Sequence, residues 1–214
     1  RRIEILEESA KALYREWFVH YRYPGHENDT MVDSELGPIP KQWEVEDLEK
    51  LLTLNYGKSL KKSERKSGLV KVFGSGGQIG WHDEYLVKGP GIVLGRKGNV
   101  GAVYWSEKDF FPIDTTYFVK SEISMRFLYF LLSEQTYSNS HTGVPGLSRD
   151  HVYRMKVVFP SEKLIHDFDG RLQAIFDLVD VLRNQTNQIC NLRDLLLPRL
   201  ISGELDVSDL DLVA

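Results

Sequence analysis

A long run near the C-terminus, poor in glycine and proline, most constrains how this chain folds. From Ser161 to about Leu200 no glycine follows Gly170 and no proline precedes Pro198. Apolar residues recur there in alternating steps of four and three, interrupted only by Thr186, at Phe168, Leu172, Ile175, Val179, Leu182 and Ile189. Such spacing is typical of a long helix paired with another helix, because it keeps one narrow apolar line facing a partner.

The length of this run favours a paired helix over the alternative, a surface helix packed on its own domain. At 1.5 Å of rise per residue it would extend roughly 55 Å. Helices of globular proteins usually have roughly 8–20 residues. The sequence therefore predicts a helical stalk.

The N-terminal end of the chain supplies a partner for the stalk helix. Within residues 1–22, apolar residues again recur in steps of three and four. We expect the first and last helices to pack antiparallel, which brings together the ends of the inserted middle segment. The helix-pairing residues predicted in this way are Leu6, Leu13, Trp17, Phe168, Leu172, Ile175, Val179, Leu182 and Ile189.

Composition places the chain among globular proteins of a reducing compartment. With 214 residues, 42% of them hydrophobic, it can form one core and a helical appendage. The sequence contains no run of eighteen apolar residues, so we predict no membrane span. The single Cys190 excludes a disulfide framework and a cysteine metal cluster, and it fits the cytoplasm. Because the chain starts at Arg1 rather than Met, we expect it to be part of something longer.

Charge is distributed unevenly along the chain. The net charge is −4, yet residues 56–120 carry eleven Lys or Arg against six Asp or Glu. A basic middle between acidic ends is compatible with a surface that binds a polyanion, because the local field steers a phosphate backbone. The alternative is a solvated lysine-rich face, and charge alone does not decide between them.

Turn residues and apolar patterns predict an α+β fold: a small mixed α/β domain on a long antiparallel coiled-coil stalk. Short β-branched or aromatic runs predict strands at 70–73, 85–87, 92–94, 102–105, 115–119 and 156–159. Helices are expected at 46–52 and 124–133. The chain thus divides into a helical region at 1–22, a polar linker with little apolar surface at 23–43, a globular domain at 44–160, a long helix at 161–203 and an acidic tail at 204–214.

Glycine-framed loops of the middle domain carry side chains of the types that bind nucleic acid in other proteins. Arg and Lys neutralise phosphates, and Arg, Lys, Gln and Asn also hydrogen-bond base edges. For phosphates we select Lys58, Lys61, Lys62, Arg65, Lys66, Arg96 and Lys97. For bases we select Gln78, His82, Asn99, His141, Thr142 and Arg149.

Motifs for catalysis in this chain are incomplete. One stretch is similar to a glycine loop that binds S-adenosylmethionine: Phe73-Gly74-Ser75-Gly76-Gly77. The Pro-Pro that enzymes need to methylate the amino group of a base is absent. Pro112-Ile113-Asp114 is not followed by the Glu-x-Lys pair of a metal nuclease. The Gly-x-Ser-x-Gly elbow of a serine hydrolase is missing. We therefore predict no catalytic residue and no metal site.

Several stretches together resemble one protein family. They include LGPIPKQWEVEDLEKLLTLNYGKSL at 36–60, IVLGRKGNVGAVYWSEKDFFPIDTTYFV at 92–119, TGVPGLSRDHV at 142–152 and LRDLLLPRLISGELD at 192–206. These stretches are similar to the specificity subunit of Type I restriction-modification systems. The resemblance extends over nearly the whole chain and corresponds to the second half of that subunit.

The resemblance implies a function and partners. It implies a non-catalytic subunit that reads one half of a bipartite site in double-stranded DNA and docks methyltransferase and restriction subunits. S-adenosylmethionine, ATP and Mg²⁺ would then be bound by those partners and not by this chain. With one recognition domain, two copies would pair through their helices to form a homodimer. The alternative is an interaction module that binds partner subunits and contacts DNA only non-specifically.

Overall fold

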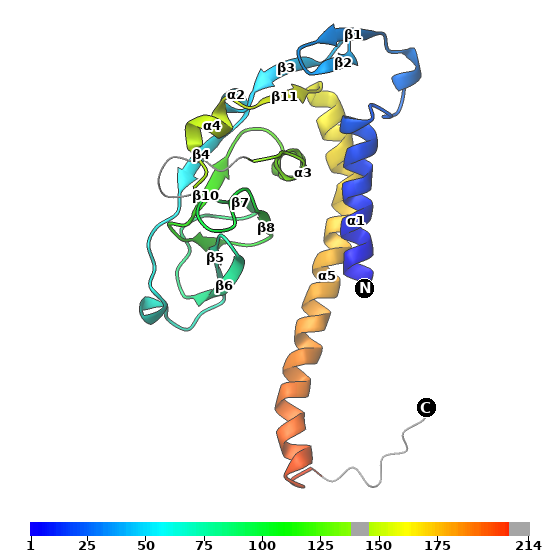
Figure 1. The fold of residues 1–214 in the computed structure, drawn as a ribbon. Coiled ribbons are helices and arrows are strands. Elements are labelled where there is room, and N and C mark those ends of the chain that lie inside the picture. The colour runs from blue at the N-terminus through cyan, green and yellow to red at the C-terminus, as the bar shows by residue number, and fades with distance from the viewer. Residues whose placement is uncertain (138–145, 206–214) are drawn as a thin grey trace, which may run out of the picture. The chain divides into compact units, whose positions relative to one another are not determined.

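The computed structural model describes residues 1–137 and 146–205, and it divides into two compact units. One unit contains Arg1–Ala10 and Leu172–Ala214, and the other contains Lys11–Arg171. Helix α1 (Arg2–Tyr14) and helix α5 (Glu162–Ile201) contribute to both (Figure 1). None of the helices in the described part of the chain has the length and apolar character needed to cross a membrane.

The predicted long C-terminal helix is confirmed. Helix α5 has 40 residues, which corresponds to roughly 60 Å. Its end is marked by Gly203, whose φ of 72° suits a residue without a side chain after a helix. In the first unit, Arg183 of α5 forms an ion pair with Glu7 of α1.

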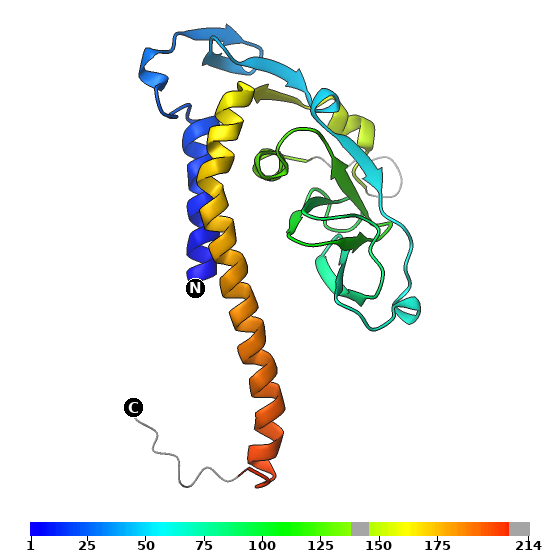
Figure 2. The ribbon, with the colours of Figure 1, turned by 180° about the vertical axis from the view of Figure 1, so that it is seen from behind.

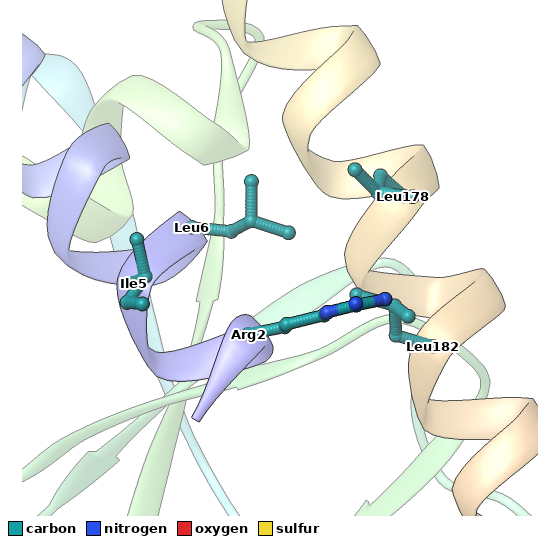
Figure 3. Close-up of a pocket in the computed structure, with 5 residues that line it drawn as sticks. All are labelled: Arg2, Ile5, Leu6, Leu178 and Leu182. Carbon is teal, nitrogen blue, oxygen red and sulfur yellow. The ribbon is translucent and has the colours of Figure 1, made fainter.

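An apolar recess lies between the start of α1 and the middle of α5 (Figure 3). Leu6 and Leu178 point toward one another there, while Arg2 extends toward Leu182. The two helices lie side by side in both views (Figures 1 and 2). The two helices run antiparallel, as the sequence predicted.

In the second unit, α1 continues into a π-helix, η1 (Arg15–Val19), whose wider turn changes the buried face. The His20 N–H donates to the Arg15 carbonyl at 2.8 Å, the i to i+5 bond of a π-turn. Tyr14 and Phe18 are therefore buried together with Trp17, whereas the predicted Leu13 is only half-buried. The helical stretch ends at Val19, earlier than the predicted Arg22.

Phe168 of α5 is fully buried. It belongs to a group of packed rings in the second unit that we call the aromatic cluster: Tyr14, Trp17, Phe18, Phe127, Phe130 and Phe168. Its ring meets the Phe18 ring edge-on, with centroids 4.9 Å apart. The ring of Phe127, from α3 (Met125–Ser133), also packs edge-on against Phe18, with centroids 5.0 Å apart. Edge-to-face pairs of this kind add about 0.5–1.5 kcal/mol each to the burial of the rings.

Two small sheets form the core of the middle domain. A four-stranded sheet has the order β4 (Thr53–Tyr56), β10 (Thr116–Lys120), β7 (Gly91–Gly95) and β8 (Val103–Ser106), all antiparallel. A three-stranded sheet has the order β6 (Gly77–His82), β5 (Val70–Gly74) and β9 (Phe110–Pro112). Phe73 and Phe110 of the second sheet pack with Val93 and Phe118 of the first.

The segment expected to be a linker is folded, so the prediction that it offers little apolar surface was wrong. Strands β1 (Met31–Ser34) and β2 (Gly37–Pro40) form a hairpin after the short helix η2 (His26–Asn28). Ile39, Tyr23 and Trp43 are buried, and the rings of Tyr23 and Trp43 stack at 5.3 Å. The segment has too few apolar residues to show a periodic pattern, yet the burial of these three side chains is enough to give it a defined fold.

Two further expectations differ from the structure because strand pairing competes with local pattern. The expected helix 46–52 is shortened to α2 (Leu48–Leu51), since β3 (Glu44–Asp47) pairs with β11 (Lys156–Phe159). The expected strand 85–87 is reduced to one bridge between Val87 and Phe110. The remaining described helices are η3 (Lys62–Glu64) and α4 (Arg149–Tyr153).

Candidate nucleic-acid interface

Several turns of the middle domain meet at one place because of how the strands are ordered. Strand β10 is antiparallel to both β4 and β7, so its start lies beside their ends. We call the segments that meet there the loop cluster: residues 56–58, 74–77, 96–101, 113–115 and 146–149. They include the turn between β5 and β6, and the connections after β4, β7 and β9.

Backbone hydrogen bonds tie these segments to one another. The N–H groups of Arg96 and Lys97 donate to the Thr115 carbonyl at 2.9 and 3.1 Å. The Leu147 N–H donates to the Arg96 carbonyl at 2.8 Å, and the Lys58 N–H to the Pro112 carbonyl at 3.0 Å. These bonds fix segments that are far apart in the sequence at one end of the domain.

Glycine permits the close approach of two of these segments. A Cβ on Gly57 would lie 2.1 Å from the Ile113 carbonyl oxygen, and one on Gly95 would lie 2.1 Å from the Asn99 carbonyl oxygen. Both contacts involve backbone atoms that cannot move aside as a side chain could. The close packing of the loop cluster therefore requires glycine at positions 57 and 95.

Two arginines of the loop cluster lie against one tyrosine ring. The Cζ atoms of Arg96 and Arg149 are 5.2 and 5.5 Å from the centroid of the Tyr56 ring. Arg96 is also 5.8 Å from the Tyr117 ring, and Arg149 is 5.8 Å from the Tyr153 ring. Within about 6 Å a guanidinium is attracted by the negative face of an aromatic ring, so both cations are held in defined positions.

Further hydrogen bonds orient this group. Nε and Nη2 of Arg96 donate to the Asp114 carbonyl at 3.3 and 2.7 Å. The Tyr117 hydroxyl donates to the Leu147 carbonyl at 2.9 Å, and burial raises the pKa of Tyr117 to about 12. The phenol therefore keeps its proton at neutral pH and continues to hold the segment that precedes Arg149.

The loop cluster is electropositive. Its cations are Lys58, Arg96, Lys97 and Arg149, and its carboxylate is the exposed Asp114. Among the described residues no carboxylate is ion-paired with these cations. Such a surface suits a negatively charged partner with many acceptor oxygens.

A family model for the Type I restriction modification DNA specificity domain matches residues 40–189, most of the chain. The chain belongs to this family. The match includes every described segment of the loop cluster and a large part of α5.

Two relatives from Methanocaldococcus jannaschii are specificity subunits of the Type I restriction enzymes MjaIX and MjaVIII. The chain is 25% identical to the first, over 97% of its own length and 54% of the relative. It is 23% identical to the second, over 99% of its own length and 57% of the relative. The chain thus spans about half the length of the curated relatives it matches.

A solved structure from the same family has the same fold. The crystal structure of the S subunit of the Type I restriction-modification system from M. genitalium superimposes with a TM-score of 0.63. The sequence identity is 17%, and the match covers 93% of this chain and 55% of the other. At that identity the comparison establishes the architecture alone.

The predicted DNA-binding residues of this family member fall into two groups. Lys58, Arg96, Lys97, Asn99 and Arg149 lie in the loop cluster, and Gln78 follows its β5–β6 turn with an exposed side chain. The others lie outside the loop cluster, in the connection between β4 and β5 and on β6 itself, and Nη1 of Arg65 donates to the Ile79 carbonyl at 2.8 Å. This second group comprises Lys61, Lys62, Arg65, Lys66 and His82.

His82 occupies a position that does not fit its predicted role in reading bases. Its side chain is 6% exposed, and Nδ1 accepts the Lys66 backbone N–H at 3.1 Å. The ring also packs edge-on against Phe111. His82 therefore orders the lysine- and arginine-rich loop at residues 57–66, which we call the basic loop, and nothing in its position directs it toward DNA. The predicted His141 and Thr142 lie outside the described residues.

Sequence reasoning did not find Tyr56. Its ring lies against both Arg96 and Arg149, which are far apart in the chain, and no local sequence motif predicts such a contact. In the sequence, Tyr56 stands directly before the glycine and lysine that begin the basic loop. A tyrosine is common at the end of a strand, so this position alone did not indicate a binding site. Long-range pairing of strands, not local pattern, creates this site.

The predicted helix-pairing residues differ in burial along α5. Phe168, Leu172 and Val179 are buried, and Ile175 and Leu182 are half-buried. Ile189, farther along the helix, is 67% exposed. On α1 and η1, Leu6 is half-buried and Trp17 is buried. In residues 1–137 and 146–205, no three His, Cys, Asp or Glu side chains are grouped so that they could hold a metal ion.

Proposed function

We propose that this chain binds double-stranded DNA through the loop cluster and reads one half of a bipartite site. The observation that carries the proposal is the convergence of Lys58, Arg96, Lys97 and Arg149 at one end of the domain. Exposed Gln78 and Asn99 lie beside these cations and have the donors and acceptors that pair with adenine. Cations would fix the register on the phosphates, and the amide side chains would contact base edges.

We also propose that the chain works as the non-catalytic specificity subunit of a Type I restriction-modification complex in the cytoplasm. Its methyltransferase and restriction subunits would bind S-adenosylmethionine, ATP and Mg²⁺. The name of the matching family and those of the relatives support this assignment. The cluster itself contributes affinity and selectivity and no bond-breaking chemistry.

Helix α5 supplies the surface for partner subunits in this proposal. Its second half exposes apolar side chains that a solitary helix would not need, including Ile189, Leu192 and Leu195. An exposed apolar stripe of this kind is typical of a protein–protein interface. A second copy of the chain is the other occupant that we propose, since pairing would supply two recognition domains.

The first experiment selects duplexes from random DNA with the chain and its methyltransferase subunit at moderate salt. We expect enrichment of a short motif, and a mirrored pair of motifs at fixed spacing if the chain forms a homodimer. Changing Arg96 and Lys97 to Gln should weaken retention at least tenfold, because hydrogen bonds to charged groups contribute about 1.5–3 kcal/mol. Lys120→Gln, at the far end of β10, is the matched control.

The second candidate function, an interaction module with non-specific DNA binding, predicts a different result. Retention would then be sensitive to salt but would enrich no motif. Changing Ile189 and Leu192 to Arg should abolish binding of the methyltransferase subunit in either case. Light scattering of the chain alone separates the occupants of α5, because a monomer at all concentrations argues against the homodimer.

A further inference from the structure

Arg96 and Arg149 form one unit because both lie against the ring of Tyr56. Their Cζ atoms are 5.2 and 5.5 Å from its centroid. The Leu147 N–H bond to the Arg96 carbonyl fixes the two segments on which they are carried. Two like charges held against one ring repel each other, so the arrangement favours an anion that both can reach.

We infer that Arg96 and Arg149, positioned by Tyr56, form a single binding site for one backbone phosphate of duplex DNA. This inference rests on the proposed DNA binding and makes it specific. It changes the role of Arg149, which the sequence alone assigned to base reading. It also gives a role to Tyr56, which touches both arginines and is itself 52% exposed.

The hydrogen bonds already made by Arg96 fix its orientation and leave part of its donors for a ligand. Nε and one N–H of Nη2 are used on the Asp114 carbonyl, and the N–H groups of Nη1 and the second N–H of Nη2 have no acceptor among the described residues. A phosphate accepts single N–H donors from several directions, so two partly engaged guanidinium groups can bind it together.

Arg149 contributes an unused donor at the same place. Its Nε is buried and has no hydrogen-bond partner among the described residues. A buried donor without a partner is unfavourable. A shift of the Arg149 side chain that opens this nitrogen to a phosphate oxygen would remove that cost.

Tyr56 is a positioning residue in this site. Its ring holds both guanidinium groups while the rest of each arginine stays half-buried. Tyr56→Leu removes the face that attracts them, whereas Tyr56→Phe keeps it. The phenylalanine variant should therefore retain binding that the leucine variant loses.

The experiment measures affinity of the full chain for one fixed duplex as a function of salt, for Arg96→Gln, Arg149→Gln, the double variant, both Tyr56 variants and Lys120→Gln. The slope of log affinity against log salt falls by about 0.9 for each phosphate that the protein no longer neutralises. We expect the slope to fall by about 1 in the double variant, by less in the single variants and in Tyr56→Leu, and not at all in Tyr56→Phe or Lys120→Gln. Thermal melting of each variant should remain at the wild-type temperature.

Three results would overturn the single-phosphate site. A slope that falls by about 2 in the double variant would mean two separate phosphates. Unchanged slopes with wild-type DNA binding intact would mean that the arginines do not touch the backbone. A changed preference at one base position in Arg96→Gln or Arg149→Gln, measured by selection from random duplexes, would mean base reading. Absence of DNA binding by the wild-type chain and its methyltransferase complex would instead refute the proposed function itself.

Discussion

Ser124 Oγ donates a 2.7 Å hydrogen bond to Asp169 Oδ1, and Ser124 Oγ also accepts the Phe127 backbone N–H at 3.1 Å. One hydroxyl thus caps the N-terminus of α3 and connects it to α5. The cap satisfies one of the free N–H groups of the first turn. Because α3 carries Phe127 and Phe130 into the aromatic cluster, this contact stabilises the helical side of the second unit.

The Asp169 side chain lies in a partly buried place that disfavours its charge. Burial raises the pKa of the carboxyl above its ordinary value, with smaller opposing effects from Ser124, Arg126 and His166. A carboxyl whose pKa is higher in the folded state favours folding most when protonated, and this advantage disappears as pH rises through the folded pKa. At neutral pH the ionised Asp169 therefore lowers the stability of the fold.

Asp169→Asn should raise the melting temperature at pH 7.5, because the amide oxygen still accepts from Ser124 and carries no charge. The gain should shrink as pH falls and vanish below the pKa of an unfolded aspartate, about 4. Thermal melts at several pH values measure it. Asp167→Asn, at an exposed position of the same helix, is the control, and an equal effect of both substitutions would contradict the explanation.

Gly57→Ala and Gly170→Ala should have opposite effects on stability. At Gly57 a methyl group would collide with the Ile113 and Pro112 carbonyls, so we expect a loss of more than about 1 kcal/mol. At Gly170, inside α5, a Cβ meets nothing within 4 Å, and alanine should add about 0.5–1 kcal/mol. Urea unfolding measures both, and a stable Gly57→Ala protein would show that the loop cluster is looser than its hydrogen bonds indicate.

Phe168 and Ile189 follow the same apolar stripe of α5, yet their burial predicts very different sensitivities. Phe168→Ala should lower the free energy of unfolding by about 3–5 kcal/mol, because it leaves a cavity among the aromatic rings. Ile189→Ala should change it by less than about 0.5 kcal/mol in the dilute, isolated chain. Phe168→Leu provides an intermediate if the alanine variant does not fold. Equal losses at 168 and 189 would mean that the second half of α5 is covered in solution.

The sequence predicted the long helices well because their signal is periodic and repeated. The α5 stripe gave its length almost to the residue, and the same spacing gave the antiparallel partner α1. The π-turn at 15–19 was not predictable, since a spacing of three and four assumes a regular helix and therefore selected Leu13 instead of Tyr14. Phe18 was missed for the same reason.

Tertiary pairing determined what local pattern missed. The hairpin at 31–40 forms although its prolines and glycines indicated a linker, because Ile39, Tyr23 and Trp43 become buried. In the site, the glycine-framed stretches singled out Arg96 and Arg149, which the structure places against one ring, while their contact with DNA stays a prediction. Their common packing against Tyr56 depends on the order of β4, β10 and β7, and no single stretch of sequence contains that order.

Glu134 should contribute more to stability than the more exposed Glu16, although each is paired with arginine. Glu134 Oε1 accepts from Arg15 Nε at 3.0 Å and lies 3.6 Å from Lys11 Nζ, and its side chain is 19% exposed. Because water screens this pair only partly, Glu134→Gln should lower the free energy of unfolding by about 1 kcal/mol, or the melting temperature by about 2–4 °C. Glu16 pairs with Arg22 at the surface, so Glu16→Gln should leave the melting temperature unchanged. Melts in low and high salt measure both variants. A loss for Glu134→Gln that disappeared at high salt would show that its carboxylate acts as an ordinary surface charge, because ions screen exposed pairs far more than enclosed ones.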